Sequence, residues 1–121
     1  MMNQIINGWQ PRSDTEMMAI AKQAVEVLPV LGNGEELKTK AQLFKALGDE
    51  TRLKIIGILK IQEACLCELV EGLEVPSSTL THHLQILERG GVVKSRKEKK
   101  FTIFSLVQDP RFDMYLASIV D

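Results

Sequence analysis

The chain has 121 residues, with 15 lysines and arginines against 16 aspartates and glutamates, and its formal net charge is −1. This length suits one domain, which would bury roughly 65% of the surface that its unfolded chain exposes. No long apolar run and no apolar leader is present, so we expect a cytoplasmic protein that is neither membrane-spanning nor secreted. The two cysteines do not form a disulfide scaffold, and a reducing compartment would keep both as thiols.

The first expected helix follows an irregular segment, residues 1–12. Ser13 and Glu16 have the spacing of a capping box, in which each side chain accepts the backbone N–H of the other residue. Pro29 should end this helix. An isolated helix of this length is marginal in water, so its apolar stripe needs a partner. The stripe consists of Met17, Ile20, Ala21, Ala24 and Leu28.

Three more helices are expected between residues 35 and 73. Residues 35–47 form the second helix, and Gly48 ends it. Asp49 can cap a third helix that runs to about Lys60 or Ile61. Residues 65–73 form a short fourth helix, and a turn follows it. The inward positions of these helices are Leu37, Ala41, Phe44, Leu47, Leu53, Ile55, Ile56, Leu59, Leu66, Leu69, Val70 and Leu73.

A fifth helix is expected from Pro76 to Arg89, because proline suits a first helical turn and Gly90-Gly91 ends the pattern. Its apolar residues recur at offsets of four and three, so this stripe must be buried. The opposite face offers side chains that suit base edges and phosphates. The stripe is Leu80, Leu84 and Leu87, and the polar face is Ser78, Thr81, His82, Gln85 and Arg89.

A basic two-stranded ribbon should follow. Residues 92–93 and 101–106 are rich in β-branched and aromatic residues and flank a charged tip. Residues 89–100 hold six basic side chains against Glu98 alone, which gives this segment a charge of +5 and leaves −6 elsewhere. Such a strip suits a polyanion, although ordinary solvated lysines on a hairpin would look the same. The basic residues are Arg89, Lys94, Arg96, Lys97, Lys99 and Lys100.

A last helix begins at Asp109-Pro110 and should run to the chain end, with Phe112, Tyr115, Leu116 and Ile119 on one side. The first and last helices therefore carry apolar stripes that a helix-turn-helix core does not need. We expect them to pair across a homodimer, which would set two recognition helices about 34 Å apart.

Four motifs in order resemble the ArsR/SmtB family of winged-helix repressors. They are ALGDETRLKIIGIL from Ala46, the C-x-C at residues 65–67, SSTLTHHLQILERGGVV from Ser77, and KEKKFTIFSL up to Leu106. The resemblance implies a mainly α, winged helix-turn-helix fold in the order α-α-α-α-β-β-α. It also implies a homodimeric repressor, joined through its terminal helices, that leaves operator DNA when a ligand binds. The expected regions are residues 1–34 for dimerisation, 35–106 for DNA binding and 107–121 for dimerisation.

The resemblance places recognition positions on Ser77, Ser78, Thr81, His82 and His83. His83 lies nearer the apolar stripe, so we assign it to packing or to phosphate binding. Adjacent histidines on a helix diverge by about 100°, which disfavours a shared metal ion. The full set expected to contact double-stranded DNA is Ser77, Ser78, Thr81, His82, His83, Gln85, Arg89, Arg96, Lys97, Lys99 and Lys100.

In the family's arsenic, cadmium and lead sensors, a C-x-C occupies the helix that here carries Cys65 and Cys67. These two residues are our candidate ligands for a soft ion, As(III), Cd, Hg or Cu(I). On a regular helix they would point about 200° apart, so a chelate needs a distorted first turn. A third thiol is absent here, and solvent, glutathione, Met17 or Met18 are left as sources of a third ligand. The last helix lacks histidine, so the family's other zinc site is not expected.

Other interpretations stay open. The cysteines can form a redox switch, or they can be small buried residues in a repressor with a different inducer. The interpretation as a thiol-disulfide enzyme is disfavoured because a C-x-x-C motif in a βαβ setting is missing. No other catalytic constellation replaces that motif, so we do not expect an enzyme. A winged helix that binds an acidic protein is the third possibility.

Overall fold

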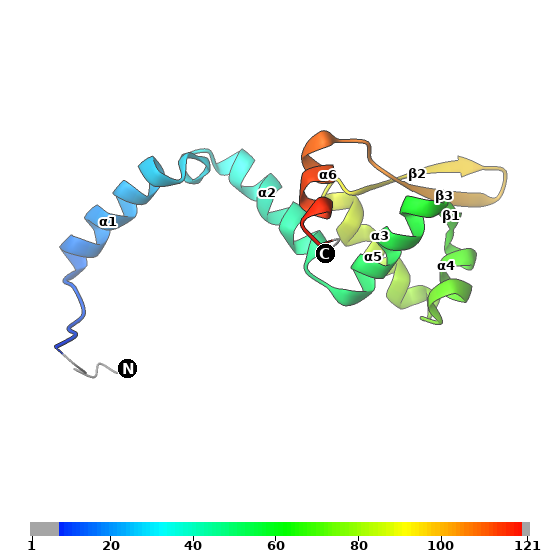
Figure 1. Cartoon of the computed structure of the whole chain (residues 1–121), viewed down its shortest axis with the longest axis horizontal. Coiled ribbons are helices and arrows are strands. Elements are labelled where there is room, and N and C mark those ends of the chain that lie inside the picture. Colours follow the sequence, from blue (N-terminus) through cyan, green and yellow to red (C-terminus); the bar gives the residue numbers. More distant parts are fainter. Residues whose placement is uncertain (1–7, 120–121) are drawn as a thin grey trace. The chain divides into compact units, whose positions relative to one another are not determined.

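The computed structural model describes residues 8–119. It divides into two compact units, Met1–Leu37 and Lys38–Asp121. The elements, labelled as in Figure 1, are α1 (Asp14–Val27), a 3₁₀ turn (Pro29–Gly32), α2 (Gly34–Leu47), α3 (Glu50–Ile61), β1 (Ala64–Cys65), α4 (Leu66–Leu73), α5 (Ser77–Arg89), β2 (Val93–Glu98), β3 (Phe101–Leu106) and α6 (Pro110–Ala117).

The mainly α class with a β-hairpin is confirmed. Five α-helices, rather than the four of the implied order, precede the hairpin in the described residues, and a short strand precedes α4. Each of the five helices has its own apolar stripe, and glycine, proline or a capping residue separates it from the next. The irregular segment expected at residues 1–12 lies mostly outside the described residues, as does the chain end at residues 120–121.

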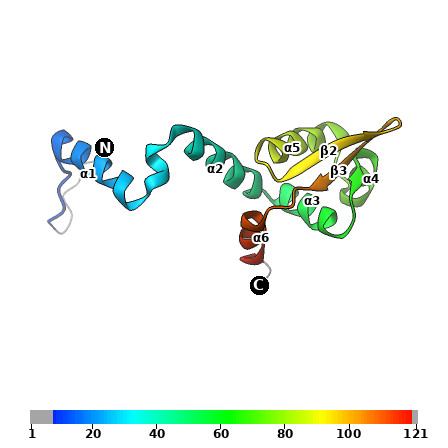
Figure 2. The same ribbon diagram turned by 90° about the horizontal axis from the view of Figure 1, so that it is seen from above.

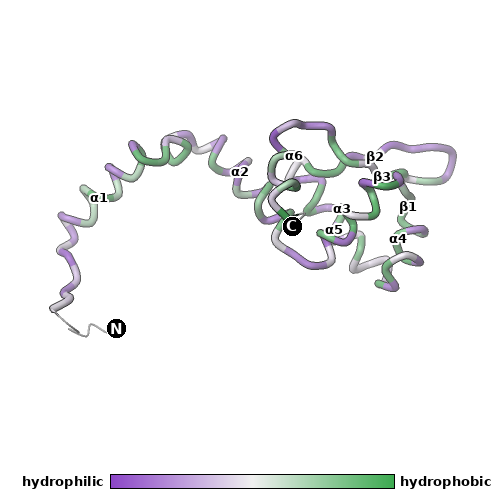
Figure 3. The backbone as a smooth tube through the Cα atoms, viewed as in Figure 1, coloured by the Kyte–Doolittle hydropathy of each residue, from purple (hydrophilic) through white to green (hydrophobic). Residues whose placement is uncertain are grey.

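The first helix begins where the capping box predicts. The Ser13 backbone N–H donates to Glu16 Oε1 at 3.0 Å, and the Glu16 N–H donates to Ser13 Oγ at 3.2 Å. No residue of α1 is buried, and hydrophobic and hydrophilic segments alternate along its tube in Figure 3. Within the first unit, the apolar stripe of α1 is therefore left unburied.

The second unit has one hydrophobic core. It is formed by the C-terminal part of α2, by α3, α4, α5 and α6, and by the small sheet. Asp49 caps α3 by accepting the Arg52 backbone N–H at 3.1 Å, and Asp109 caps α6 by accepting the Arg111 N–H at 2.9 Å. The core residues are Ala46, Ile55, Ile56, Leu59, Ala64, Leu69, Leu80, Leu84, Ile86, Leu87, Val92, Val93, Phe104, Phe112 and Leu116.

The sheet has three antiparallel strands in the order β1-β3-β2. The β2 and β3 strands form a hairpin that pairs Val93 with Leu106 at its base and Glu98 with Phe101 beside its tip. This hairpin is the wing, and its tip points away from the helices in Figures 1 and 2. The two-residue strand β1 pairs Cys65 with Ile103, and it was not expected from the sequence.

The two glycines after α5 act differently. Gly91 has a φ of +75°, which is the left-handed conformation expected at the end of a helix. Gly90 instead has a right-handed conformation, and a Cβ there would lie 2.7 Å from the Ala46 Cβ and 2.8 Å from the Gln42 carbonyl oxygen. Gly90 is thus needed because α5 and α2 approach closely, which corrects the common explanation given for the pair.

Candidate DNA interface and cysteine site

Helix α5 has one buried and one exposed face. Leu80, Leu84 and Leu87 are 0%, 2% and 0% exposed, as their spacing predicts. The three-residue turn Glu74-Val75-Pro76 connects α4 to α5, and these two helices pack together. This is a helix-turn-helix, with α5 as its second helix. The exposed residues of α5 include Ser77, Ser78, Thr81, His82, Gln85 and Arg89.

On this exposed face, the side chain of Thr81 already forms a hydrogen bond within α5. The Thr81 hydroxyl donates to the Ser77 carbonyl oxygen at 2.8 Å, one helical turn earlier. Its oxygen keeps free lone pairs, so Thr81 presents an acceptor and a methyl group outward. A base-edge donor or a thymine methyl group fits this surface.

His83 differs from its neighbours on α5 because it contacts α3. Its Nδ1 atom lies 3.0 Å from Nη1 of Arg52 and 3.7 Å from Oδ2 of Asp49. The His83 side chain is only 14% exposed, and Arg52 is the only buried charged residue in the described part of the chain. The hydrogen bond from the Arg52 backbone N–H lowers the pKa of Asp49. His83 is therefore half inside the domain, as its position at the edge of the stripe suggested.

Arg96 lies in ion pairs at the wing. Its guanidinium donates to the two carboxylate oxygens of Glu63 at 2.8 and 2.6 Å, and to Glu98 at 3.2 Å. The bonds to Arg96 lower the pKa of the Glu63 carboxyl, and Glu63 in turn raises the pKa of Arg96. Glu63 directly precedes β1, so this pair joins β2 to the segment that leads into the cysteines.

The lysines at the wing tip are placed differently. Lys97, Lys99 and Lys100 are exposed, and no ion pair within residues 8–119 includes them. Lys99 forms the turn with a φ of 57°, and the Lys100 Nζ lies 5.6 Å from the centre of the Phe101 ring. These three lysines accordingly present positive charge that no ion pair in the described residues offsets, and Figure 3 shows the end of the hairpin as hydrophilic.

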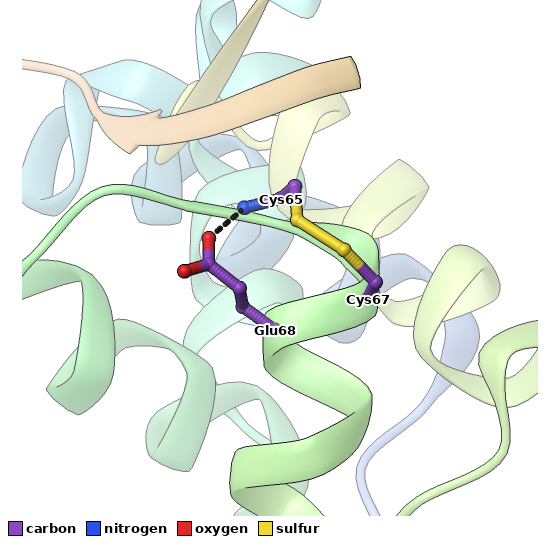
Figure 4. Close-up of a disulfide and its surroundings, with 3 residues drawn as sticks. All are labelled: Cys65, Cys67 and Glu68. Carbon is purple, nitrogen blue, oxygen red and sulfur yellow. Dashed lines mark hydrogen bonds between the residues drawn. A yellow bond between two sulfur atoms is a disulfide. The ribbon is translucent and has the colours of Figure 1, made fainter. Parts of the chain in front are cut away.

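Cys65 and Cys67 are joined by a disulfide (Figure 4). The expectation that both are separate thiols is therefore wrong for this structure. The reason is that Cys65 is not helical: it is the N-cap of α4 in an extended conformation, with φ −86° and ψ 167°. The side chains hence do not diverge by the angle of a regular helix, and the two Cα atoms are 5.5 Å apart.

The surroundings of the two cysteines are unequal. Cys65 is 6% exposed, and its backbone N–H donates to Glu68 Oε1 at 3.0 Å, the bond drawn in Figure 4. Cys67 is exposed. The idea that both are buried hydrophobic residues is therefore wrong for Cys67, which solvent molecules can reach.

As ligands, the cysteines supply two sulfur atoms that can approach each other. Once reduced, they form a soft donor pair that fits a thiophilic ion better than a hard cation. Within residues 8–119, no cluster of three or more histidine, cysteine, aspartate or glutamate side chains could hold a metal ion. The described residues of these four types therefore add no third ligand to the two sulfurs.

Two features of this region were missed from the sequence. Arg52 stands three, four and seven residues before Ile55, Ile56 and Leu59, so it shares their buried face. A charged residue on an otherwise apolar helix face indicates that its charge is paired inside the fold, so the sequence alone could have suggested this contact. The contact between Glu63 and Arg96, by contrast, links residues 33 positions apart, and β1 is too short for its pattern to show.

None of the helices within residues 8–119 combines the length and the hydropathy that a membrane-spanning segment needs.

The fold and the exposed polar face of α5 define a class, the winged helix-turn-helix DNA-binding proteins. A family profile described as "Bacterial regulatory protein, arsR family" matches residues 49–95. The chain belongs to the ArsR family of DNA-binding transcriptional regulators.

Individual relatives of known class support the assignment to this family of transcriptional regulators. The chain is 40% identical over 76 residues to an HTH-type transcriptional regulator of Methanocaldococcus jannaschii, covering 62% of this chain and 85% of that one. It is 36% identical to the arsenical resistance operon repressor of Escherichia coli, covering 66% and 68% of the two chains. It is 30% identical to a transcriptional repressor SmtB homolog of Synechocystis, covering 90% and 82%.

Solved structures show the same fold. The transcriptional regulator HlyU from Vibrio vulnificus is similar with a TM-score of 0.58 and 34% identity, covering 75% of this chain and 98% of that one. A homodimeric winged helix-turn-helix domain from Mycobacterium bovis aligns with a TM-score of 0.66 and 23% identity, covering 72% and 81%.

Proposed function

We propose that this chain represses transcription by binding operator DNA through α5 and the wing, and that Cys65 and Cys67 control its release. The observation that carries the DNA-binding part is the division of α5. Its apolar face is packed into the core, while a continuous polar face is left exposed. A helix held this way can enter the major groove and read base edges.

Within this interface the residues have separate roles. Thr81, His82 and Gln85 lie near the middle of the exposed face and would contact base edges, while Ser77 and Ser78 lie at the N-terminus of α5, where N–H groups favour phosphate. Arg89 and the wing-tip lysines Lys97, Lys99 and Lys100 would contact phosphates. Arg96 would contribute less, because Glu63 and Glu98 already offset its charge.

The functional form would be a homodimer. The apolar residues of α1 are exposed in the single chain, for example Met17 at 47% and Ile20 at 40%. The Mycobacterium bovis domain, which shares the fold, is described as homodimeric. We assign residues 1–34 and 107–121 to dimerisation and residues 35–106 to DNA binding. Sedimentation should show a dimer at micromolar concentration, and a monomer would contradict this assignment.

The inducer would be a soft metal or metalloid ion held by the two cysteine sulfurs after reduction. The Escherichia coli relative is an arsenical resistance operon repressor, and sulfur ligands select As(III), Cd, Hg or Cu(I) over hard cations. The exposed side of Cys67 leaves room for a ligand from solution, such as glutathione. The ion would supply a bridge between the sulfurs that alters the start of α4.

The position of Cys65 explains how a local change could reach DNA. Cys65 is at once the last residue of β1, which pairs with the wing strand β3, and the N-cap of α4, which packs against α5. A shift at Cys65 would therefore move both parts of the interface. Loss of about 1.4 kcal/mol of operator affinity already means a tenfold weaker complex.

A second candidate inducer is an oxidant, and the disulfide in this structure favours it. With hydrogen peroxide, one thiolate attacks an oxygen and becomes a sulfenic acid, and the O–O bond breaks with release of the first water. The second thiol then attacks the sulfenic sulfur and displaces its hydroxyl group as the second water. The products are the disulfide and two molecules of water, because two electrons pass from the sulfurs to the peroxide. A thiol reductant would reverse the change.

These inducers can be separated by fluorescence anisotropy of the protein on the DNA upstream of its own gene. We expect the reduced protein to be released by As(III) or Cd(II) but not by Zn(II). Release by hydrogen peroxide alone, reversed by dithiothreitol, would instead establish the redox switch. Tight binding that neither ions nor peroxide disturb would support the DNA-binding function and contradict a sensing role of the cysteines.

The best variant for this test is Cys67→Ser, since Cys67 is exposed and its replacement leaves the core untouched. It should bind DNA like the parent and respond neither to a soft ion nor to peroxide. The Cys65→Ser/Cys67→Ser double variant should behave in the same way. A normal response of either variant would place the sensor elsewhere.

A further inference from the structure

The buried guanidinium of Arg52 connects three helices of the winged unit. Its Nε donates to the Ala46 carbonyl oxygen at 3.1 Å, and its Nη2 donates to the Lys45 carbonyl oxygen at 2.9 Å. These carbonyls lie in the last turn of α2, where the regular i to i+4 bonds end. Arg52 therefore caps that helix, together with the Gly48 backbone N–H, which also donates to the Lys45 carbonyl oxygen at 3.2 Å. The third group, Nη1, reaches Nδ1 of His83 on α5.

The contact between Arg52 and His83 fixes where the imidazole carries its proton. A guanidinium has only donors and stays protonated, so Nη1 must donate and His83 Nδ1 must accept. A neutral imidazole that accepts at Nδ1 has its hydrogen on Nε2. The Asp49 carboxylate, 3.7 Å from Nδ1, is too distant for a hydrogen bond and is occupied by the backbone N–H of Arg52.

The remaining nitrogen of His83 faces the surface. No hydrogen bond of His83 Nε2 is present within residues 8–119, and no fully buried side-chain nitrogen or oxygen there lacks a partner. The Nε2–H group therefore reaches solvent. It does so from the boundary between the buried stripe of α5 and its exposed polar face.

We propose that Arg52 is a positioning residue that locks His83 in the Nε2–H tautomer, so that this N–H donates to a backbone phosphate of the bound DNA. The inference rests on the proposed function, in which α5 lies in the major groove. At the margin of such a helix the neighbouring group is the sugar-phosphate backbone, whereas base edges lie opposite its centre. A neutral donor held at this place fixes the register of α5 without reading sequence.

Nuclear magnetic resonance tests the lock without DNA. The chain has only two histidines, so a two-bond ¹H–¹⁵N spectrum of the full chain shows two imidazoles. At mildly alkaline pH, His83 should show a protonated Nε2 and an unprotonated Nδ1, while exposed His82 serves as the internal comparison. A hydrogen on Nδ1 of His83, or the same tautomer mixture at both histidines, would overturn the lock.

Two substitutions then test separately the contact of His83 with Arg52 and its contact with the phosphate. The oxygen of His83→Asn can still accept from Arg52, but no donor reaches the phosphate. The amide of His83→Gln places a donor near the Nε2 position and loses the contact with Arg52. We expect His83→Asn to keep the thermal stability and to bind DNA about two- to tenfold more weakly. His83→Gln should lose stability and keep more of the DNA affinity.

The salt dependence distinguishes this contact from a charged one. Because neutral His83 releases no counterion, His83→Asn should weaken binding equally to upstream and shuffled DNA without changing the salt slope. Unchanged affinity would overturn the phosphate contact, and a flatter slope would show that His83 acts as a cation. If the wild type binds no DNA, the proposed function fails and the phosphate contact with it, while the spectrum still decides the lock.

Discussion

Helix α5 and the wing hold their functional side chains in different ways. Four residues of α5 are buried, and Arg52 ties it to two neighbouring helices. In β2, by contrast, only Val93 is buried and the following five residues are exposed. A helix fixed by its core can present base-reading groups at defined positions, whereas lysines on an exposed strand supply charge over a wider range of positions. Under the proposed function, specificity would therefore come from α5 and affinity from the wing.

The largest effect should come from the buried side of α5. Leu84 is 2% exposed in the centre of the core, so Leu84→Ala should lower the free energy of unfolding by about 2–5 kcal/mol. Denaturant unfolding followed by circular dichroism measures this. Gln85→Ala, on the exposed neighbour, is the matched control and should change stability by less than about 0.5 kcal/mol. Equal losses in the two variants would contradict the orientation of α5.

On the exposed side of α5, sequence discrimination should fall while stability is kept. Single replacements of Thr81, His82 and Gln85 by alanine should each cost about 1–3 kcal/mol of binding to the upstream DNA for a base contact. Binding to shuffled DNA should change little. Competition titrations with both duplexes measure the ratio, and a uniform loss on both would assign the residue to the backbone instead.

The wing should show the opposite pattern. Replacing Lys97, Lys99 and Lys100 together by alanine should weaken binding to all sequences and flatten the salt slope, by up to about one unit for each lost phosphate contact. Anisotropy titrations at several salt concentrations give the slope. An unchanged slope would remove these lysines from the interface and leave a solvated hairpin.

A smaller effect is expected from Arg96, although it carries the same charge as the lysines. Its ion pairs with Glu63 and Glu98 already offset that charge, so Arg96→Ala should flatten the slope by clearly less than one lysine replacement. The same titrations compare Arg96→Ala with Lys97→Ala. A larger effect for Arg96 would show that it leaves Glu63 when DNA binds.

The smallest effect concerns acid pH. The pKa of Glu63 is lowered in the folded protein from its ordinary value of 4.5. Its pair with Arg96 therefore contributes stability above this pH and loses it as the pH falls through the lowered pKa. The stability difference between wild type and Glu63→Gln should shrink in acid, as thermal unfolding at several pH values can show. A difference that is constant with pH would contradict the pairing.

Periodicity predicted the buried faces of α3, α4 and α5, but it was wrong for Leu37, Ala41 and Phe44 of α2, which are exposed. The stripe of Leu80, Leu84 and Leu87, the capping box at Ser13 and the cap at Asp49 all depend on neighbours within one turn. The hairpin followed from β-branched and aromatic residues on both sides of a charged tip. In each case the interaction is local, so the sequence contains the information.

The features that the sequence did not predict depend on residues that are far apart in the chain. The helix expected at residues 65–73 includes Cys65, but Cys65 pairs with Ile103 of β3, is extended, and is joined to Cys67 by a disulfide. The contacts of Arg52 with His83 and of Glu63 with Arg96 join residues 31 and 33 positions apart. Such contacts depend on how the helices and the sheet are packed, which no periodic pattern specifies.

The central claim is that α5 and the wing bind operator DNA, and its most direct test is fluorescence anisotropy of the reduced wild-type protein. Upstream and shuffled duplexes would be titrated at a series of salt concentrations. We predict tighter binding to the upstream duplex, with a logarithmic affinity that falls linearly with the logarithm of salt concentration. Salt-dependent binding without any preference between the duplexes, or no binding, would contradict an operator-specific repressor and favour a wing that binds an acidic protein.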